Sequence, residues 1–307
     1  MSARVAAVLL ILLAATSGAA VADYRKFTAA PVDARWQSKL QQIAADTEHQ
    51  FPKLADKDLA LSVVDLTDPA HAVRADYHGD APFYPASVIK LFTMVEIYRR
   101  HQETLPDVPR ALEEMIGVSD NDAAAFLLDV ATGTSSGPEL SGRALDRFLR
   151  DRASINRDFS SLGYDVSAMC KPWSFGPFGR DVQAVGPNRE RRNRVTANAV
   201  ASLLLWIVRG EAVSPAASKA MKGLLARQIP EPPEVPPEQD QVKEFLGAGL
   251  PAGTHLWSKA GWTSEVRNDA AYVELPDGRK LVLVVLTRGL VDEPKLLPAI
   301  AARLSAP

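Results

Sequence analysis

The feature that most constrains the fold of this chain is a set of three strand-like segments near its carboxyl terminus. They read THLWSKAGW, NDAAYVEL and KLVLVVLTRG, and they are rich in the β-branched and aromatic residues that favour extended chain. Pro-Asp-Gly separates the second segment from the third, and such a turn sequence predicts a β-hairpin. This end of the chain therefore predicts an antiparallel sheet.

Two more strand-like segments lie near the amino terminus, Leu59–Leu66 and the run AVRADYHG, joined by the turn sequence TDPA. Helical periodicity precedes them over Asp33–His49, fills the middle of the chain and returns over Glu293–Leu304. Strands at both ends with helices between them predict an α+β fold. We expect one antiparallel five-stranded sheet built from both chain ends. Terminal helices should cover one face and an all-helical insertion the other.

The expected fold divides into an α/β part, about residues 33–85 and 245–307, and a helical part, about residues 86–228. Residues 229–240 (IPEPPEVPPEQD) are rich in proline and glutamate, which predicts an exposed, polyproline-like loop. Residues 164–193 show no clear period. Such a long irregular segment inside a compact domain is usually functional or disordered.

The composition is that of a globular protein, with 47% hydrophobic residues and a net charge of −2 over 307 residues. Because basic and acidic residues are dispersed and balanced, we expect no nucleic-acid partner. The one local basic run, Arg189–Arg194, is interpreted as a solvated, salt-bridged loop. We expect a monomer.

The first 22 residues have the layout of a secretory signal peptide. Met1–Ala22 contains an early arginine, an apolar core and the small residues AVA before Asp23. Cleavage after Ala22 would leave a single domain over residues 23–307. We expect this mature chain to be periplasmic or secreted, without stable membrane insertion.

Few side chains are suited to hold a metal ion. Cys170 is the only cysteine, which excludes an intrachain disulfide and a thiol-rich metal site. The five histidines show no metal-ligand spacing, and no G-x-S-x-G nucleophile elbow occurs. We therefore expect no metal and no cofactor, and chemistry carried by ordinary side chains.

Ser87 and Lys90 interrupt an apolar segment, FYPASVIKLF, three residues apart. We expect one helix to carry both residues and to run to about His101, and on a helix this spacing places both side chains on one face and within contact. One interpretation is a helix N-cap followed by a lysine whose amine reaches water. The other is a serine nucleophile whose proton is taken by a lysine that burial or a second cation keeps neutral.

Two further motifs allow the same two kinds of interpretation. Ser119-Asp120-Asn121 directly precedes a helical run and suits a helix cap. Lys259-Ala260-Gly261 lies on the first of the carboxyl-terminal strands and suits a strand with a solvated lysine. Each motif is weak alone, but the order, spacing and structural context of all three are much more specific.

Together the motifs resemble the S-x-x-K, S-D-N and K-T-G set of class A β-lactamases and penicillin-binding proteins. The segments GVSDNDAAAFLL and AGLPAGTHLWSKAGW and the last two strands are also similar to that family. The resemblance covers roughly Asp33 to the carboxyl terminus, interrupted by residues 164–193 and the proline-rich loop. It implies the serine β-lactamase and DD-peptidase fold, and a β-lactam or cell-wall peptide as the substrate.

The resemblance also implies a role for each matching residue. Ser87 would attack the substrate carbonyl, and Lys90 would accept or relay its proton. Ser119 would pass a proton to the leaving nitrogen, and Asn121 would hydrogen-bond the substrate amide. Lys259 would supply positive charge for a substrate carboxylate and keep Lys90 deprotonated.

The third motif is implied to complete the oxyanion hole and the binding strand. The backbone N–H groups of Ser87 and Trp262 would hold the developing negative charge. Gly261 would leave room for a ligand along the strand. Trp262 stands where the family has a small residue, so its ring would narrow the site, stack on a substrate ring or point into the core.

A second departure is Ala260, which removes the hydroxyl that usually helps to bind the substrate carboxylate. Thr263, Ser264 or Arg267 would replace it. Arg267 is the first choice, because it lies near the start of the next strand.

The third departure concerns release of the acyl group. Class A β-lactamases carry a glutamate in an E-x-x-L-N segment that positions the deacylating water, and this sequence has no such segment. The corresponding loop should lie around Trp173–Val185, where Asp181 is the only carboxylate. Asp181 would act as the base, or Glu190 would fold back to do so. Without a base the acyl-enzyme would be long-lived.

The leading hypothesis is an exported serine hydrolase that opens a β-lactam amide through an acyl-enzyme on Ser87, with slow deacylation. The first alternative keeps the nucleophile but acts on cell-wall peptides, as a D-alanyl-D-alanine peptidase or another penicillin-binding acyl-enzyme. The second alternative is a non-catalytic penicillin-binding or sensor module. A purely structural exported protein is a further possibility.

Overall fold

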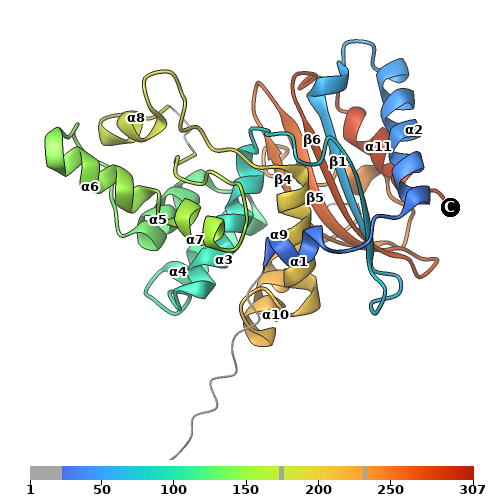
Figure 1. Ribbon diagram of the computed structural model, residues 1–307, viewed down its shortest axis with the longest axis horizontal. Coiled ribbons are helices and arrows are strands. Elements are labelled where there is room, and N and C mark those ends of the chain that lie inside the picture. Colours follow the sequence, from blue (N-terminus) through green and yellow to red (C-terminus); the bar gives the residue numbers. More distant parts are fainter. Residues whose placement is uncertain (1–22, 173–175, 231–233) are drawn as a thin grey trace, which may run out of the picture.

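The computed structural model describes residues 23–172, 176–230 and 234–307. The predicted signal peptide, Met1–Ala22, lies outside these residues. Figure 1 shows a sheet flanked by helices beside a second part made of helices alone. Within the described ranges, no helix has the length and apolarity needed to cross a membrane.

The strands form one antiparallel sheet in the order β2-β1-β6-β5-β4-β3. They are β1 Leu59–Asp65, β2 Val73–Tyr77, β3 Ala226–Arg227, β4 His255–Trp262, β5 Arg267–Glu274 and β6 Lys280–Thr287. The predicted α+β fold, with a sheet built from both chain ends, is confirmed. The predicted number of five strands is wrong, because β3 extends the sheet beside β4. A two-residue strand is too short to produce an alternating sequence pattern.

The β5–β6 hairpin follows the predicted turn. Gly278 has φ +90°, a conformation that glycine adopts without strain. Along β6, side chains alternate between the two faces of the sheet: Leu281 and Leu283 join one core, and Val282 and Val284 join the other. This alternation is the two-residue period that a strand imposes.

Helices lie at both ends and in the middle of the described chain. They are α1 Tyr24–Thr28, α2 Ala34–Gln50, α3 Lys90–Arg99, α4 Val108–Gly117, α5 Asn121–Thr132, α6 Gly142–Arg152, α7 Ser154–Ser161, α8 Arg180–Val185, α9 Ala197–Arg209, α10 Pro215–Leu224 and α11 Leu296–Ser305. Short 3₁₀ helices are η1 Asp56–Asp58, η2 Ala86–Ile89 and η3 Leu246–Gly249. The predicted amphipathic helix at Asp33–His49 is α2, with Asp33 as its N-cap.

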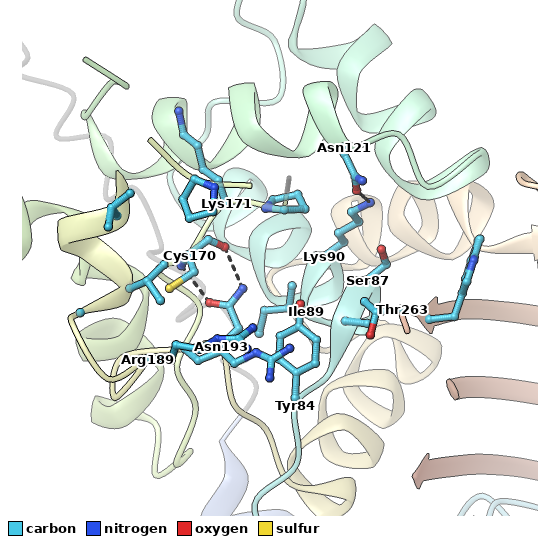
Figure 2. Close-up of a pocket in the computed structure, with 18 of the residues that line it drawn as sticks. Tyr84, Ser87, Ile89, Lys90, Asn121, Cys170, Lys171, Arg189, Asn193 and Thr263 are labelled. Atoms are coloured by element: carbon cyan, nitrogen blue, oxygen red, sulfur yellow. Dashed lines mark hydrogen bonds between the residues drawn. The ribbon is translucent and has the colours of Figure 1, made fainter. Parts of the chain in front are cut away.

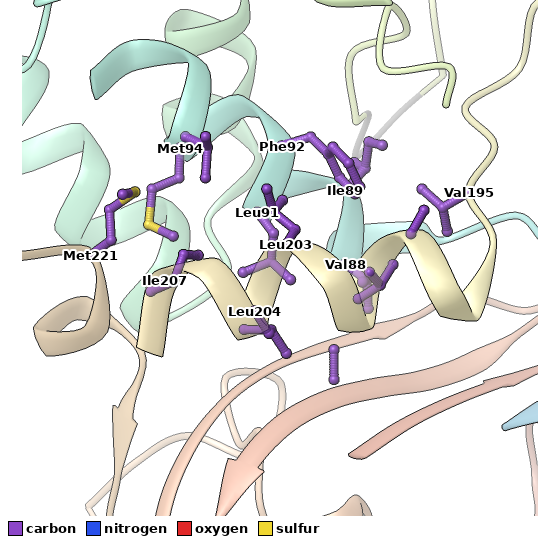
Figure 3. Close-up of a cluster of buried hydrophobic side chains, with 14 of the residues drawn as sticks. Val88, Ile89, Leu91, Phe92, Met94, Val195, Leu203, Leu204, Ile207 and Met221 are labelled. Carbon is purple, nitrogen blue, oxygen red and sulfur yellow. The ribbon is translucent and has the colours of Figure 1, made fainter. Parts of the chain in front are cut away.

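Two apolar cores hold the molecule together. In the first, α2 and α11 cover one face of the sheet (Figure 1). In the second, α9 lies against the opposite face and packs on α3, which joins the sheet to the helical part. Figure 3 shows Leu91 and Met94 of α3 close to Leu203 and Ile207 of α9. Burying one such side chain contributes roughly 1.5–3 kcal/mol, so this contact places α3 firmly.

Candidate active site

Ser87 lies in a tight turn that packs against strands β4 and β5. It belongs to the 3₁₀ helix η2, one turn before α3 begins, and not to the α-helix expected from the sequence. In a 3₁₀ turn residues three apart nearly eclipse each other, which keeps Ser87 and Lys90 on one side. Ala86 has φ +47°, a strained conformation for a non-glycine residue that costs about 1–3 kcal/mol.

Gly261 explains why that strained turn persists. A Cβ at Gly261 would lie 2.7 Å from the Pro85 carbonyl oxygen and 2.8 Å from the Ser87 nitrogen. The side chain of Asn268 also donates a hydrogen bond to the Tyr84 carbonyl at 3.0 Å. These contacts give Gly261 a reason beyond the predicted space for a ligand, which stays a prediction. The glycine is needed because β4 approaches the backbone of the nucleophile turn itself.

The Lys90 side chain is buried and does not extend to the protein surface. Every residue of α3 from Lys90 to Tyr98 is buried, and Lys90 itself is 1% exposed. Its amine donates to the Ser119 carbonyl at 2.6 Å and to Asn121 Oδ1 at 2.9 Å. Figure 2 shows Ser87 and Lys90 on the same wall of a cavity, with the Lys90 amine turned toward Asn121.

The protonation of Lys90 follows from this burial. Desolvation disfavours the ammonium form and lowers the pKa of Lys90 to about 7, although the nearby Asp120 carboxylate opposes the shift. A neutral amine has two N–H donors and one lone pair. The carbonyls of Ser119 and Asn121 take the two donors, which leaves the lone pair able to accept a hydroxyl proton.

The Ser119–Asn121 segment combines both interpretations made from the sequence. Asp120 is the N-cap of α5, because its side chain accepts from the Ala123 N–H at 2.7 Å. Ser119 has φ +61°, and this bend turns its carbonyl and its hydroxyl toward Lys90. Asp120 therefore caps the helix, while Ser119 and Asn121 on either side of it contact Lys90.

Lys259 lies on β4 and is completely buried. Its amine donates to Gln241 Oε1 at 2.5 Å and to the Ala260 carbonyl at 2.7 Å, and it is 3.0 Å from Ser119 Oγ. Ser119 Oγ is 3.2 Å from the Lys90 amine, so it joins the two lysines. Burial, with the neighbouring charges of Lys90 and Arg227, lowers the pKa of Lys259 well below its ordinary value.

A cavity of about 450 Å³ opens at Ser87. Around the nucleophile its walls are Ser87, Lys90, Asn121, Trp262 and Thr263. Further from the nucleophile the walls are mostly apolar, formed by Ile89, Pro172, Pro177, Val182, Val185 and Pro187. Ser119 and Lys259 are not among the described lining residues, so they meet the cavity only through their neighbours.

Three cationic residues also line the cavity, but each has an acidic partner. The Lys171 amine is turned away, toward Asp129 at 2.5 Å (Figure 2). Arg189 and Arg192 both pair with Glu265, at 3.4 and 2.6 Å. Among the described lining residues there is no carboxylate.

Asp181, the predicted deacylation base, does not reach this cavity. It is 2% exposed and lies 3.3 Å from the guanidinium of the fully buried Arg152. Helix α8 turns its neighbour Val182 to the cavity instead. Glu190 accepts from the Asn188 N–H and pairs with Arg191, so it does not fold back either. Trp173–Phe175, in the same window, lie outside the described residues.

Arg267 is also absent from the cavity, contrary to its predicted role in binding a carboxylate. Its guanidinium pairs with Glu244 at 2.7 Å and donates to the Val291 carbonyl at 2.9 Å. Thr263 does line the cavity, and Figure 2 places it beside Ser87. Trp262 is among the lining residues, and its ring packs on Phe245.

Sequence reasoning missed Gln241 altogether. It follows the proline-rich segment directly, and composition there predicted only an exposed loop. In the structure Gln241 is 1% exposed and contacts Lys259. No periodicity or motif marks it, because a single buried residue after an irregular segment leaves no pattern.

The fold and these residues define a class of protein: a serine hydrolase that acts on amide bonds, with lysine in place of histidine beside the nucleophile. The sequence profile of the beta-lactamase enzyme family matches residues 104–306. The chain belongs to this family. The match begins beyond Lys90, and a search of curated proteins finds no match.

Solved structures share the fold. A mutant of PBP-A, in an acyl-enzyme complex with penicillin G, is 20% identical with a TM-score of 0.62, covering 87% of this chain and 95% of that one. A beta-lactamase from Sphaerobacter thermophilus is 20% identical, with a TM-score of 0.59 and the same coverage. A beta-lactamase from Chitinophaga pinensis is 16% identical, with a TM-score of 0.60, covering 87% of this chain and 97% of that one.

Proposed function

We propose that this protein opens the amide of a β-lactam and holds the product for a long time as an ester on Ser87. The Lys90 lone pair accepts the Ser87 hydroxyl proton while Oγ attacks the lactam carbonyl. The negative charge that develops on the carbonyl oxygen is held by the backbone N–H groups of Ser87 and Trp262. The C–N bond then breaks, and Ser119 passes a proton to the leaving nitrogen.

The observation that carries this proposal is the buried amine of Lys90 in the same cavity as Ser87. A serine hydroxyl is a weak nucleophile until a neighbouring group removes its proton. Lys90, with its pKa lowered to about 7, is matched to that task near neutral pH. Ser119 lies between Lys90 and Lys259, which supports its role in carrying the proton onward.

The proposal that the acyl group is released slowly rests on the same cavity, which has a base for acylation but no carboxylate among its described lining residues. Hydrolysis of the ester requires a base that activates water, and the described lining residues offer no carboxylate. Asp181 is engaged with Arg152. The PBP-A structure in an acyl-enzyme complex with penicillin G has the same fold, which supports an acyl group at this position.

The test is the mass of the intact protein after incubation with penicillin G. We expect one adduct of the mass of the antibiotic, no adduct on Ser87→Ala, and an adduct lifetime far longer than its formation time. With the chromogenic β-lactam nitrocefin, this predicts a stoichiometric burst followed by slow turnover. Absence of any adduct on the folded protein would refute the proposal.

A cell-wall peptide is the second candidate substrate, because a cavity without a water-activating carboxylate also suits transfer of the acyl group to an amine. A synthetic peptide ending in D-alanyl-D-alanine separates the two. Release of D-alanine faster than penicillin is turned over would make the peptide the natural substrate.

Export remains part of the proposal and rests on the layout of Met1–Ala22. Fractionation of cells that express the full chain, with amino-terminal sequencing of the product, tests it. We expect a mature protein that begins at Asp23, outside the cytoplasm. A full-length product in the cytoplasm would contradict export without affecting the chemistry.

A further inference from the structure

Gln241 connects the two halves of the active site. Its side chain is almost fully buried and uses both ends of its amide. Oε1 accepts from the Lys259 amine at 2.5 Å and from the Ala260 N–H at 3.3 Å. The amide nitrogen donates to the Gly117 carbonyl at 2.7 Å and to the Ile116 carbonyl at 3.3 Å.

The position of those two carbonyls matters. Gly117 is the last residue of α4, and the last carbonyls of a helix need partners outside it. Two residues further along the chain is Ser119, whose hydroxyl contacts both lysines. The Gln241 amide therefore ties β4, which carries Lys259, to the end of the helix that presents Ser119.

The electrostatic role of Gln241 follows from what surrounds Lys259. Its amine meets three uncharged acceptors: Gln241 Oε1, the Ala260 carbonyl and Ser119 Oγ. The charged groups that act on it are the cations Lys90 and Arg227 and the buried anion Asp269. Asp269 accepts from the Leu246 and Ala270 N–H groups, and burial raises its pKa to about 6.

A neutral amide in this place differs from a carboxylate in one decisive way. It satisfies one N–H of Lys259 but adds no negative charge that would hold a proton on either lysine. Conversely, an apolar side chain would leave the Lys259 amine and the Gly117 carbonyl without a buried partner, which is costly.

We propose that Gln241 is a positioning residue for the acylation step. It holds the Lys259 amine against Ser119 Oγ and, being uncharged, lets the Lys90–Ser119–Lys259 chain exchange a proton near neutral pH. This inference rests on the proposed function, because acylation of Ser87 is the step that it serves.

The experiment compares Gln241→Glu and Gln241→Met with the unchanged chain. Gln239→Glu serves as the matched control, since it adds the same charge two residues away. The rate constant for Ser87 acylation by penicillin G is measured from the adduct mass between pH 5 and pH 10. Near-ultraviolet circular dichroism establishes that each variant is folded.

Gln241→Glu should move the acid limb of the acylation profile upward by about one pH unit, because a carboxylate near an amine raises its pKa. Gln241→Met should lower acylation by roughly tenfold at every pH, as expected for one lost hydrogen bond to a charged group. Gln239→Glu should leave the profile unchanged. A purely structural glutamine would affect stability but not the pH of the limb.

A second readout keeps the inference testable if penicillin G is not a substrate. The unfolding midpoint is measured against pH for the same variants. In the unchanged chain, the free energy of unfolding should rise from about pH 7 toward pH 10. In this range Lys90 and Lys259 bind protons more readily in the unfolded chain than in the folded one, because burial lowers their pKa values in the folded protein. Gln241→Glu should flatten this rise, and Gln239→Glu should not.

The outcomes separate the two proposals. No adduct on the unchanged chain refutes the proposed function, while the unfolding curves still test Gln241. An adduct on the unchanged chain, with the same acid limb in Gln241→Glu and the same rate in folded Gln241→Met, overturns the role of Gln241 alone.

Discussion

The two sides of the cavity are built in opposite ways. On the nucleophile side, Ser119 Oγ contacts the buried amines of both Lys90 and Lys259, and Ser87 lines the cavity together with Lys90. On the side of residues 164–193, the described wall is largely apolar, and its cationic residues are paired with acidic ones. In the proposed function the first side forms an ester, and among the described residues the second side has no carboxylate to activate water. If the proposed function is right, acylation and acyl release depend on different sides of one cavity and can be changed independently.

The largest expected effect concerns the base. Lys90→Met should reduce the acylation rate by about 10²–10⁴, the usual contribution of a positioned general base. Lys222→Met is the matched control, since Lys222 lies over the Trp257 ring and is not among the described cavity residues. Adduct formation with penicillin G measures both. Acylation of Lys90→Met at the native rate would show that Lys90 is not the base.

Asp181→Asn tests whether the loop side has a structural or a catalytic carboxylate. Losing one partner of a buried ion pair costs about 3 kcal/mol or more, so the variant should unfold at lower urea while its rate of acyl release stays the same. Asp165→Asn, at an exposed pair with Arg194, should cost less than about 1 kcal/mol. A slower acyl release in folded Asp181→Asn would restore this residue as the base.

Val182→Glu should place a water-activating carboxylate on the apolar side of the cavity. Val182 lines the cavity and is 42% exposed, so a longer polar side chain can be accommodated. We expect acyl release to accelerate roughly tenfold, at the low end of what general-base catalysis supplies. Val182→Gln has the same shape without the charge and should release the acyl group at the native rate. Equal release by both variants would show that a missing carboxylate is not what limits turnover.

The smallest effect is a graded dependence on pH. Acylation needs neutral Lys90, whose pKa is lowered to about 7. The rate should therefore fall below pH 7 and level off above it, while acyl release should not follow this limb. Stopped-flow measurement of the nitrocefin burst and of the later turnover gives both profiles. A pH-independent burst between pH 5 and pH 9 would contradict the role of Lys90.

Much of the fold was predictable because its elements carry strong local patterns. The three carboxyl-terminal strands, the Pro-Asp-Gly hairpin and the amphipathic helix after Asp33 follow from periodicity and turn chemistry. The two-residue strand β3 was not predictable, because its pairing with β4 is a tertiary contact. The start of α3 at Lys90, rather than before Ser87, was missed as well, because β4 and β5 hold the turn in place.

The identity and order of the chemical groups can be read from the amino-acid sequence: a serine and a lysine one turn apart, a second serine before a capped helix, and a second lysine on a strand. These depend on short spacings and on a family resemblance. Which of these groups come into contact depends on the folded structure. It turned Arg267 to Glu244 and Asp181 to Arg152, and it brought Gln241 to Lys259. Such choices depend on burial and on competing charged partners far apart in the chain, and local sequence patterns do not encode them.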